Sequence, residues 1–157
     1  MSGCRNVFAH HLIKATAVMI MLESLDISDC VQFDSDNLIK VMSRLPLLVT
    51  INISNCSSLS GFIFDRFTEF QNLCSVSSSG NQQMEFESIS RFLGSSSKIK
   101  RLCLSRSHIF KCGLMDMALC KSLDSLDVSS CGLTIVSSWL MFAILCSHMV
   151  IRIPLFR

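Results

Sequence analysis

The stretch LESLDISDC, residues 22–30, decides the fold of this 157-residue chain. It fills the template Leu-x-x-Leu-x-Leu-x-x-Cys, which returns as LVTINISNC at residues 48–56 and as LDSLDVSSC at residues 123–131. Weaker copies occupy residues 73–81 and 99–107. The last template positions are 30, 56, 81, 107 and 131, so the copies follow one another at intervals of 26, 25, 26 and 24 residues. A period of this length predicts a solenoid in which each repeat packs on its neighbours.

Between the template copies, apolar residues recur at three- and four-residue spacing, which predicts helices. The first helix has Asp34 or Ser35 as its N-cap and ends before Pro46, and Gly94 is expected to end the third helix. The apolar stripes expected to pack inward are Leu38, Ile39, Met42 and Leu45; Phe62, Phe64, Phe67 and Phe70; Phe86, Ile89, Phe92 and Leu93; and Met115, Met117, Leu119 and Cys120. The predicted architecture is α/β, a curved solenoid with parallel strands on its concave face and helices on its convex face.

The template resembles the cysteine-containing class of leucine-rich repeats, over most of the chain. In that family the Leu-x-x-Leu-x-Leu segment is a short strand, and the residue at the last position lies inside the turn that follows. The resemblance implies structural turn anchors whose small polar groups satisfy backbone N–H groups. These anchors are Cys30, Cys56, Asn81, Ser107 and Cys131.

The resemblance divides the chain into three parts. Residues 1–21 form an N-terminal helical segment or partial repeat, residues 22–146 form five repeats, and residues 147–157 form a truncated sixth repeat or an aberrant tail. In the sixth repeat, Val150, Ile153 and Leu155 fit the apolar template positions, which puts the anchor at position 158. The sequence departs from the family pattern from about residue 135, and we hypothesise a truncated product or splice variant.

Residues 133–155 raise the alternative of a membrane-tethered repeat protein. Half of the chain is hydrophobic, 17% is charged, and its mean hydropathy is +0.48. A transmembrane helix needs about 20 predominantly apolar residues. Polar residues interrupt this segment, namely Ser137, Ser138, Ser147, His148 and Arg152. A buried helix over residues 136–146 is therefore favoured, and a membrane partner is unlikely on this reading.

The sequence offers little for catalysis or metal binding. The nine cysteines show no CxxC or CxxH spacing, which argues against a zinc site, and free thiols indicate a cytoplasmic or nuclear protein. Asp34 and Asp36 suggest a calcium loop, but the required glycine and terminal glutamate are missing, so a helix N-cap is favoured. Cys103 and His108 form no recognisable catalytic motif. We expect no enzymatic activity, no metal and no cofactor.

A binding surface is predicted by the alternation of side chains along each strand. The residues expected to face outward on the concave side are Ser24, Asp26, Ser28, Thr50, Asn52, Ser54, Ser75, Ser77, Ser79, Arg101, Cys103, Ser105, Ser125, Asp127 and Ser129. The middle row is Asp26, Asn52, Ser77, Cys103 and Asp127, and with Arg101 it forms the predicted partner-binding site. A solvated sheet face without a dedicated partner is the alternative.

Five basic residues, Lys98, Lys100, Arg101, Arg106 and Lys111, fall within one repeat together with His108. They are expected to act mainly as solubilising charge at strand ends. Arg101 should face the concave side, where an acidic or phosphorylated segment of a partner could use it. Nucleic acid is an unlikely partner, because the net charge is only +2 and aromatic residues are not interleaved with the cluster.

The phrases LESLDISDC, TINISNC and LDVSSCGLT resemble the Zyg-type substrate receptors of cullin-RING ubiquitin ligases, and less closely the F-box group. That resemblance implies a repeat array that recruits a protein substrate, here without an F-box or a convincing adaptor box. A cullin or elongin partner would then bind through a missing segment. The alternative is a scaffold or inhibitor-type repeat protein with no ligase partner.

Overall fold

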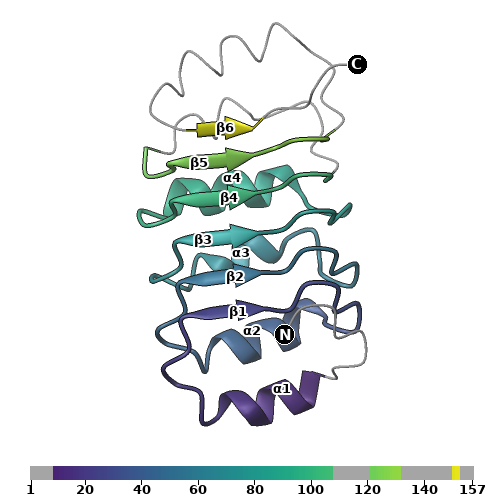
Figure 1. Ribbon diagram of the computed structural model, residues 1–157, viewed down its shortest axis with the longest axis vertical. Helices are drawn as coiled ribbons and strands as arrows, with labels where there is room; N and C mark the ends of the chain where they lie inside the picture. The colour runs from purple at the N-terminus through teal and green to yellow at the C-terminus, as the bar shows by residue number, and fades with distance from the viewer. Residues whose placement is uncertain (1–8, 108–120, 132–149, 153–157) are drawn as a thin grey trace, which may run out of the picture.

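Six parallel strands form one sheet in which sequence neighbours are also spatial neighbours (Figure 1). The computed structural model describes residues 9–107, 121–131 and 150–152. The strands are β1 (Ser24–Asp26), β2 (Thr50–Asn52), β3 (Ser75–Ser77), β4 (Arg101–Cys103), β5 (Ser125–Asp127) and β6 (Val150–Arg152). Each strand adds to the sheet directly after the one before it, as expected for a solenoid of repeats. The predicted α/β architecture of parallel strands and helices is confirmed.

Helices connect the first four strands on one side of the sheet, and one further helix precedes the first strand. They are α1 (Ala9–Thr16), α2 (Ser35–Met42), α3 (Ile63–Phe67) and α4 (Phe86–Ser95), with α2, α3 and α4 behind the sheet and α1 beyond β1 (Figure 1). The Asp34 side chain caps α2 by accepting a hydrogen bond from the Asn37 N–H at 2.7 Å. Asp34 is therefore an N-cap, as its position predicted. The helices expected around Met115–Cys120 and over residues 136–146 lie outside the described residues.

Two details of the helix predictions are wrong. Gly94 lies inside α4, which continues to Ser95. Gly94 is exposed and has open space around it, and one exposed glycine costs a helix only about 1 kcal/mol relative to alanine. Phe62 is 54% exposed because it precedes the five-residue α3, whose first residue, Ile63, is buried instead.

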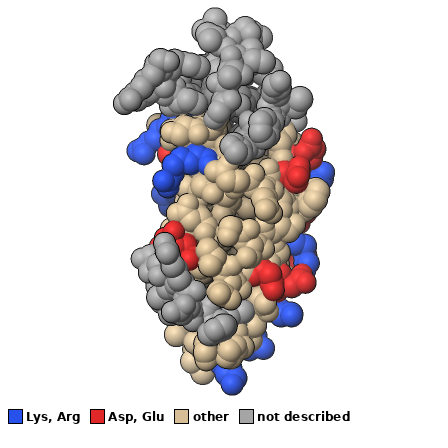
Figure 2. All heavy atoms as spheres, turned by 90° about the vertical axis from the view of Figure 1, so that its right-hand side faces the viewer, with Lys and Arg blue, Asp and Glu red and all other residues tan. Residues whose placement is uncertain are grey.

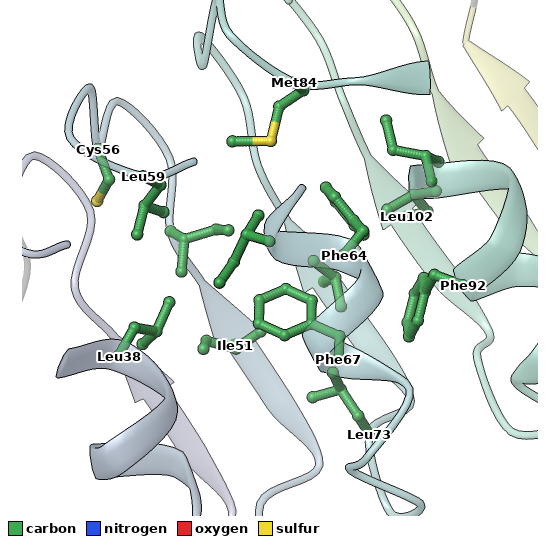
Figure 3. Close-up of a cluster of buried hydrophobic side chains, with 14 of the residues drawn as sticks. Leu38, Ile51, Cys56, Leu59, Phe64, Phe67, Leu73, Met84, Phe92 and Leu102 are labelled. Atoms are coloured by element: carbon green, nitrogen blue, oxygen red, sulfur yellow. The ribbon is translucent and has the colours of Figure 1, made fainter. Parts of the chain in front are cut away.

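Buried side chains from strands, turns and helices form one core (Figure 3). The central residue of every strand from β1 to β5 points inward and is buried. Between α3 and α4, the rings of Phe64, Phe67 and Phe92 form a cluster with centroid separations of 5.5, 5.6 and 6.1 Å. Aromatic pairs at these distances attract one another beyond the effect of burial alone. This cluster fixes the spacing of the second and third repeats.

The sixth template copy lies two residues earlier than expected. Ile151, not Ile153, pairs with Leu126 and occupies the central strand position. The Val150 N–H donates to the Asp124 carbonyl at 2.8 Å, and this places Val150 beside Ser125 with its side chain 67% exposed.

Val150–Arg152, within the apolar segment 133–155, is thus a strand of the sheet. In the described part of the chain, no helix has the length and apolar character needed to cross a membrane.

Candidate functional site

The anchor residues lie in the turns that follow the strands, and the side chains of Cys56, Asn81, Ser107 and Cys131 bond back to the preceding repeat. The Cys56 thiol donates to the Ile27 carbonyl at 3.1 Å, and the Cys131 thiol donates to the Leu104 carbonyl at 2.9 Å. The Ser107 hydroxyl donates to the Ser78 carbonyl at 3.2 Å, and Asn81 Nδ2 donates to the Ile53 carbonyl at 2.8 Å. In every case the acceptor lies three positions before the preceding anchor.

These four bonds run to backbone carbonyls, because a thiol, hydroxyl or amide N–H has a proton to donate. The expected contact with backbone N–H groups is present as well. Asn81 Oδ1 accepts from the Cys56 N–H at 2.7 Å, and backbone N–H groups of the preceding turn, those of Cys30 and Ser107, interact with the Cys56 and Cys131 sulfurs. Burial raises the pKa of the Cys56 thiol to about 11 and also raises that of Cys131. Both thiols therefore keep their protons at neutral pH.

The residue before each anchor adopts a left-handed backbone conformation. The φ angles are 61° at Asp29, 57° at Asn55, 72° at Gly80, 56° at Arg106 and 58° at Ser130. Aspartate, asparagine and glycine adopt this conformation most readily. Their occurrence just before the first three anchors was a signal of the turn that sequence reasoning missed.

The concave face, meaning the sheet face opposite the helices, brings the predicted site residues together. Parallel pairing aligns the middle row, Asp26, Asn52, Ser77, Cys103 and Asp127, and adds Arg152 as its sixth member. Arg101 lies in the flanking row with Ser24, Thr50, Ser75, Ser125 and Val150. The five predicted residues of the middle row are half-buried, whereas Arg101 and Arg152 are exposed.

Three side chains of the middle row are held in place by the serine two residues later. Asp26 Oδ1 accepts from the backbone N–H of Ser28 at 2.9 Å and from its hydroxyl at 2.7 Å. The same pair of bonds joins Asn52 to Ser54 and Asp127 to Ser129. These polar side chains are therefore fixed before any partner arrives.

The pKa of Asp26 is lowered, although burial alone would raise it. Hydrogen bonds from the Ser28 hydroxyl and N–H, with a further one from Asn52, outweigh the effect of burial. Asp26 is consequently a carboxylate at neutral pH, and it places a fixed negative charge at the β1 end of the face.

Of the five serines expected to face outward after the strands, Ser105 and Ser129 are half-buried like the middle row, whereas Ser28, Ser54 and Ser79 are only 7 to 8% exposed. Ser54 and Ser79 also link neighbouring repeats. The Ser54 hydroxyl lies 3.0 Å from that of Ser77, and the Ser79 hydroxyl lies 2.8 Å from that of Ser105 and 3.1 Å from the Cys103 sulfur.

The predicted basic cluster is dispersed. Lys98 donates to Asn72 Oδ1 at 3.2 Å, and Lys100 forms an ion pair with Asp124 at 3.7 Å, both before the strands. Arg106 lies in the turn after β4, at the opposite end of the strand from Lys100. Lys111 and His108 lie outside the described residues. Of the described members, Arg101 is the one that lies on the concave face.

Charged side chains are unevenly placed on the molecule. The sheet side of the molecule is the left-hand edge of Figure 2, where Lys and Arg side chains gather in the upper part and Asp and Glu side chains lie below them. Uncharged side chains cover the area between the sheet and helix margins (Figure 2). In residues 9–107, 121–131 and 150–152, no three His, Cys, Asp or Glu side chains lie close enough to hold a metal ion.

No family model matches the chain, and no curated protein sequence matches it. Solved structures do. Yeast Rad7, in its complex with Elc1, superposes with a TM-score of 0.78 at 19% identity, over 96% of this chain and 38% of Rad7. The tropomodulin C-terminal domain of Caenorhabditis elegans matches with a TM-score of 0.67 at 12% identity, over 90% of this chain and 93% of that domain. TLR13, in its complex with ssRNA13, matches with a TM-score of 0.60 at 20% identity, over 83% of this chain and 18% of TLR13.

These similarities establish the leucine-rich repeat fold. The chain spans well under half the length of Rad7 and about a fifth of TLR13. Function does not follow from a shared fold, since one fold carries many different binding sites.

Proposed function

We propose that the chain binds a protein or peptide partner on its concave face. The observation that carries the proposal is the continuous, aligned row of short polar side chains across the strands. Short side chains allow the backbone of a partner to approach the sheet closely. The bonds from Ser28, Ser54 and Ser129 hold the Asp26, Asn52 and Asp127 side chains in place, so binding need not immobilise them.

The finer proposal is that this face recruits the substrate of a cullin-RING ubiquitin ligase. The phrases LESLDISDC and LDVSSCGLT support it by their resemblance to Zyg-type receptors. The structural similarity to Rad7, which was solved with Elc1, is in line with it. We place such a protein in the cytoplasm or nucleus.

The second candidate is a scaffold or inhibitor-type binder without a ligase partner. The similarity to the tropomodulin domain favours it, because this match extends over 93% of that domain and thus needs no additional segment. The two candidates share the concave face as binding site and differ in whether ligase subunits are recruited.

The test is photo-crosslinking in cells that express the chain. A photoreactive amino acid replaces Ser24, which is exposed on the concave face, or Lys40, which is exposed on α2 as a matched control. We expect a partner crosslinked at position 24 and not at position 40, and we expect Ser77→Arg to abolish the crosslink while the chain stays folded. Equal crosslinking at both positions would refute the proposal.

Ligase recruitment is read separately, by whether elongin or cullin subunits copurify with the chain. Copurification of these subunits supports a substrate receptor if Ser77→Arg abolishes the crosslink to the substrate but leaves the ligase subunits bound. A crosslinked partner without any ligase subunit supports the scaffold.

A further inference from the structure

Two exposed arginines lie on the concave face, on alternate strands. Arg101 is the first residue of β4, and Arg152 is the last residue of β6. Parallel pairing puts Arg101 beside Ser125 and Arg152 beside Asp127, so the two arginines flank β5. With strands about 4.8 Å apart and about 3.3 Å per residue, their Cα atoms are on the order of 12 Å apart. Arginine side chains are long enough to converge over the strand between them.

Neither arginine is neutralised by a carboxylate within the part of the chain that the structure describes. The ion pairs there are Arg66 with Glu69, Arg91 with Asp65, and Lys100 with Asp124. Arg101 Nε donates only a long bond of 3.5 Å to the Ser75 hydroxyl, which is easily given up. Asp127, the nearest carboxylate in the register, has its Oδ1 engaged by the hydroxyl and N–H of Ser129.

We propose that Arg101 and Arg152 together bind a carboxylate-rich segment of the protein partner, seated over β5. The inference rests on the proposed function, because it names the partner chemistry of the same face. A guanidinium group matches a carboxylate with two parallel hydrogen bonds, which gives direction as well as attraction. At the β1 end the carboxylate of Asp26 has no basic residue on β1 to β3 beside it and repels an acidic chain, whereas over β4 to β6 the two arginines outnumber the carboxylate of Asp127, so the acidic part of the partner lies there.

An acidic peptide fits this surface better than a nucleic acid does. The six aligned strands present no aromatic side chain outward, so bases have no ring on which to stack. Asp26 also lies in the middle row, where a phosphate backbone that follows the whole face would meet its carboxylate.

The test is fluorescence anisotropy with the full chain and three labelled probes. These are a peptide of alternating glutamate and serine, the same peptide with glutamine in place of glutamate, and a single-stranded oligonucleotide of equal charge. We expect binding of the glutamate peptide and none of the glutamine peptide. Arg101→Glu and Arg152→Glu should each weaken binding about tenfold, as expected for loss of a charged hydrogen-bonded contact.

Lys40→Glu is the matched control, because it makes the same charge change at an exposed position on α2. Arg101→Gln, which keeps a polar side chain, should also weaken binding, and circular dichroism verifies that each variant is folded. The inference is overturned if Lys40→Glu weakens binding equally, if the glutamate peptide does not bind, or if the oligonucleotide binds more tightly with the same dependence on both arginines. A crosslink at position 24 that survives these results would leave the proposed function standing and the acidic partner refuted.

Discussion

Replacing Asn81 by alanine or by cysteine tests how the turn anchors stabilise the solenoid. Asn81 is 2% exposed and makes three hydrogen bonds, to the Cys56 N–H at 2.7 Å, to the Ile53 carbonyl at 2.8 Å and to the Ser78 hydroxyl at 2.8 Å. At about 1 kcal/mol for each bond, Asn81→Ala should lower the free energy of unfolding by about 3 kcal/mol. That is a large part of the stability of an ordinary domain.

Cysteine at position 81 should recover part of this loss, because the Cys56 and Cys131 turns show the arrangement that it would adopt. There a thiol donates to the carbonyl of the preceding repeat, at 3.1 and 2.9 Å. The Ile27 carbonyl, which accepts from the Cys56 thiol, also accepts from the Cys30 N–H. With cysteine at position 81, the Ile53 carbonyl would take the same two bonds, from the new thiol and from the Cys56 N–H. We therefore expect Asn81→Cys to lose about half as much as Asn81→Ala.

The measurement is urea unfolding followed by circular dichroism, with Gln83→Ala as the control because Gln83 is exposed two residues away. With a denaturant dependence of about 2 kcal/mol per molar, the midpoint for Asn81→Ala should fall by about 1.5 M. Equal losses for the alanine and cysteine variants would show that the donated bond to the Ile53 carbonyl contributes nothing. A loss for Asn81→Ala no greater than that of the control would refute the structural role of the anchor.

Three further outcomes follow from the described geometry. Gly80→Ala should destabilise the chain by about 1 to 2 kcal/mol, because φ is +72° and an added Cβ would lie 2.2 Å from Asn55 Oδ1; an unchanged melting temperature would contradict this. The raised pKa of Cys56 means that the protonated thiol stabilises the fold fully below pH 9.0, and that about 3 kcal/mol of stability is lost as pH rises through about 11. Cys56→Ser should reduce the alkaline loss in urea unfolding to the part that the Cys131 thiol contributes, because its pKa is also raised; an unreduced loss would contradict this. The Arg91 guanidinium lowers the pKa of Asp65. This carboxylate therefore stabilises the fold above its ordinary pKa of 3.8 and ceases to do so as pH falls through the lowered value. Asp65→Asn should flatten the acid side of the curve of unfolding free energy against pH, and a curve identical to that of the wild type would argue against the ion pair with Arg91.

The repeat spacing was sufficient to predict the strands, because a strand position repeated five times admits one register that buries every apolar residue. Leu25, Ile51, Val76, Leu102 and Leu126 all occupy the central position that the template assigned. The N-cap role of Asp34 was also predictable, since it depends on local sequence.

The sixth copy could not be placed from pattern alone. Two alignments of its apolar residues were possible, one starting at Val150 and one that puts polar His148 at the first template position. Strand pairing selects the second, because it keeps the backbone bond between Val150 and Asp124. The prediction took Val150 as the first buried residue of the copy, but Val150 is exposed on the concave face.

The site was predicted in outline and missed in detail. Alternation along the strands identified the middle row, but it could not show that Ser28, Ser54 and Ser79 are covered by the side chains to which their hydroxyls bond. Proximity in sequence also suggested one basic cluster, whereas Lys98 and Lys100 lie before the strand β4 and Arg106 lies after it. Arg152 was missed although both registers place it on the outward side, because residues 147–157 were interpreted as a truncated repeat or an aberrant tail and not as part of the face.

The turn bonds give the array a polarity along its axis. Each anchor side chain donates backward, so a repeat completes the turn of the one before it and depends for its own turn on the one after it. Removing a repeat at the C-terminal side therefore takes a donor from its neighbour, whereas removing one at the N-terminal side takes away only an acceptor. Shortened arrays of equal length should accordingly differ in stability according to the side from which the repeats were deleted.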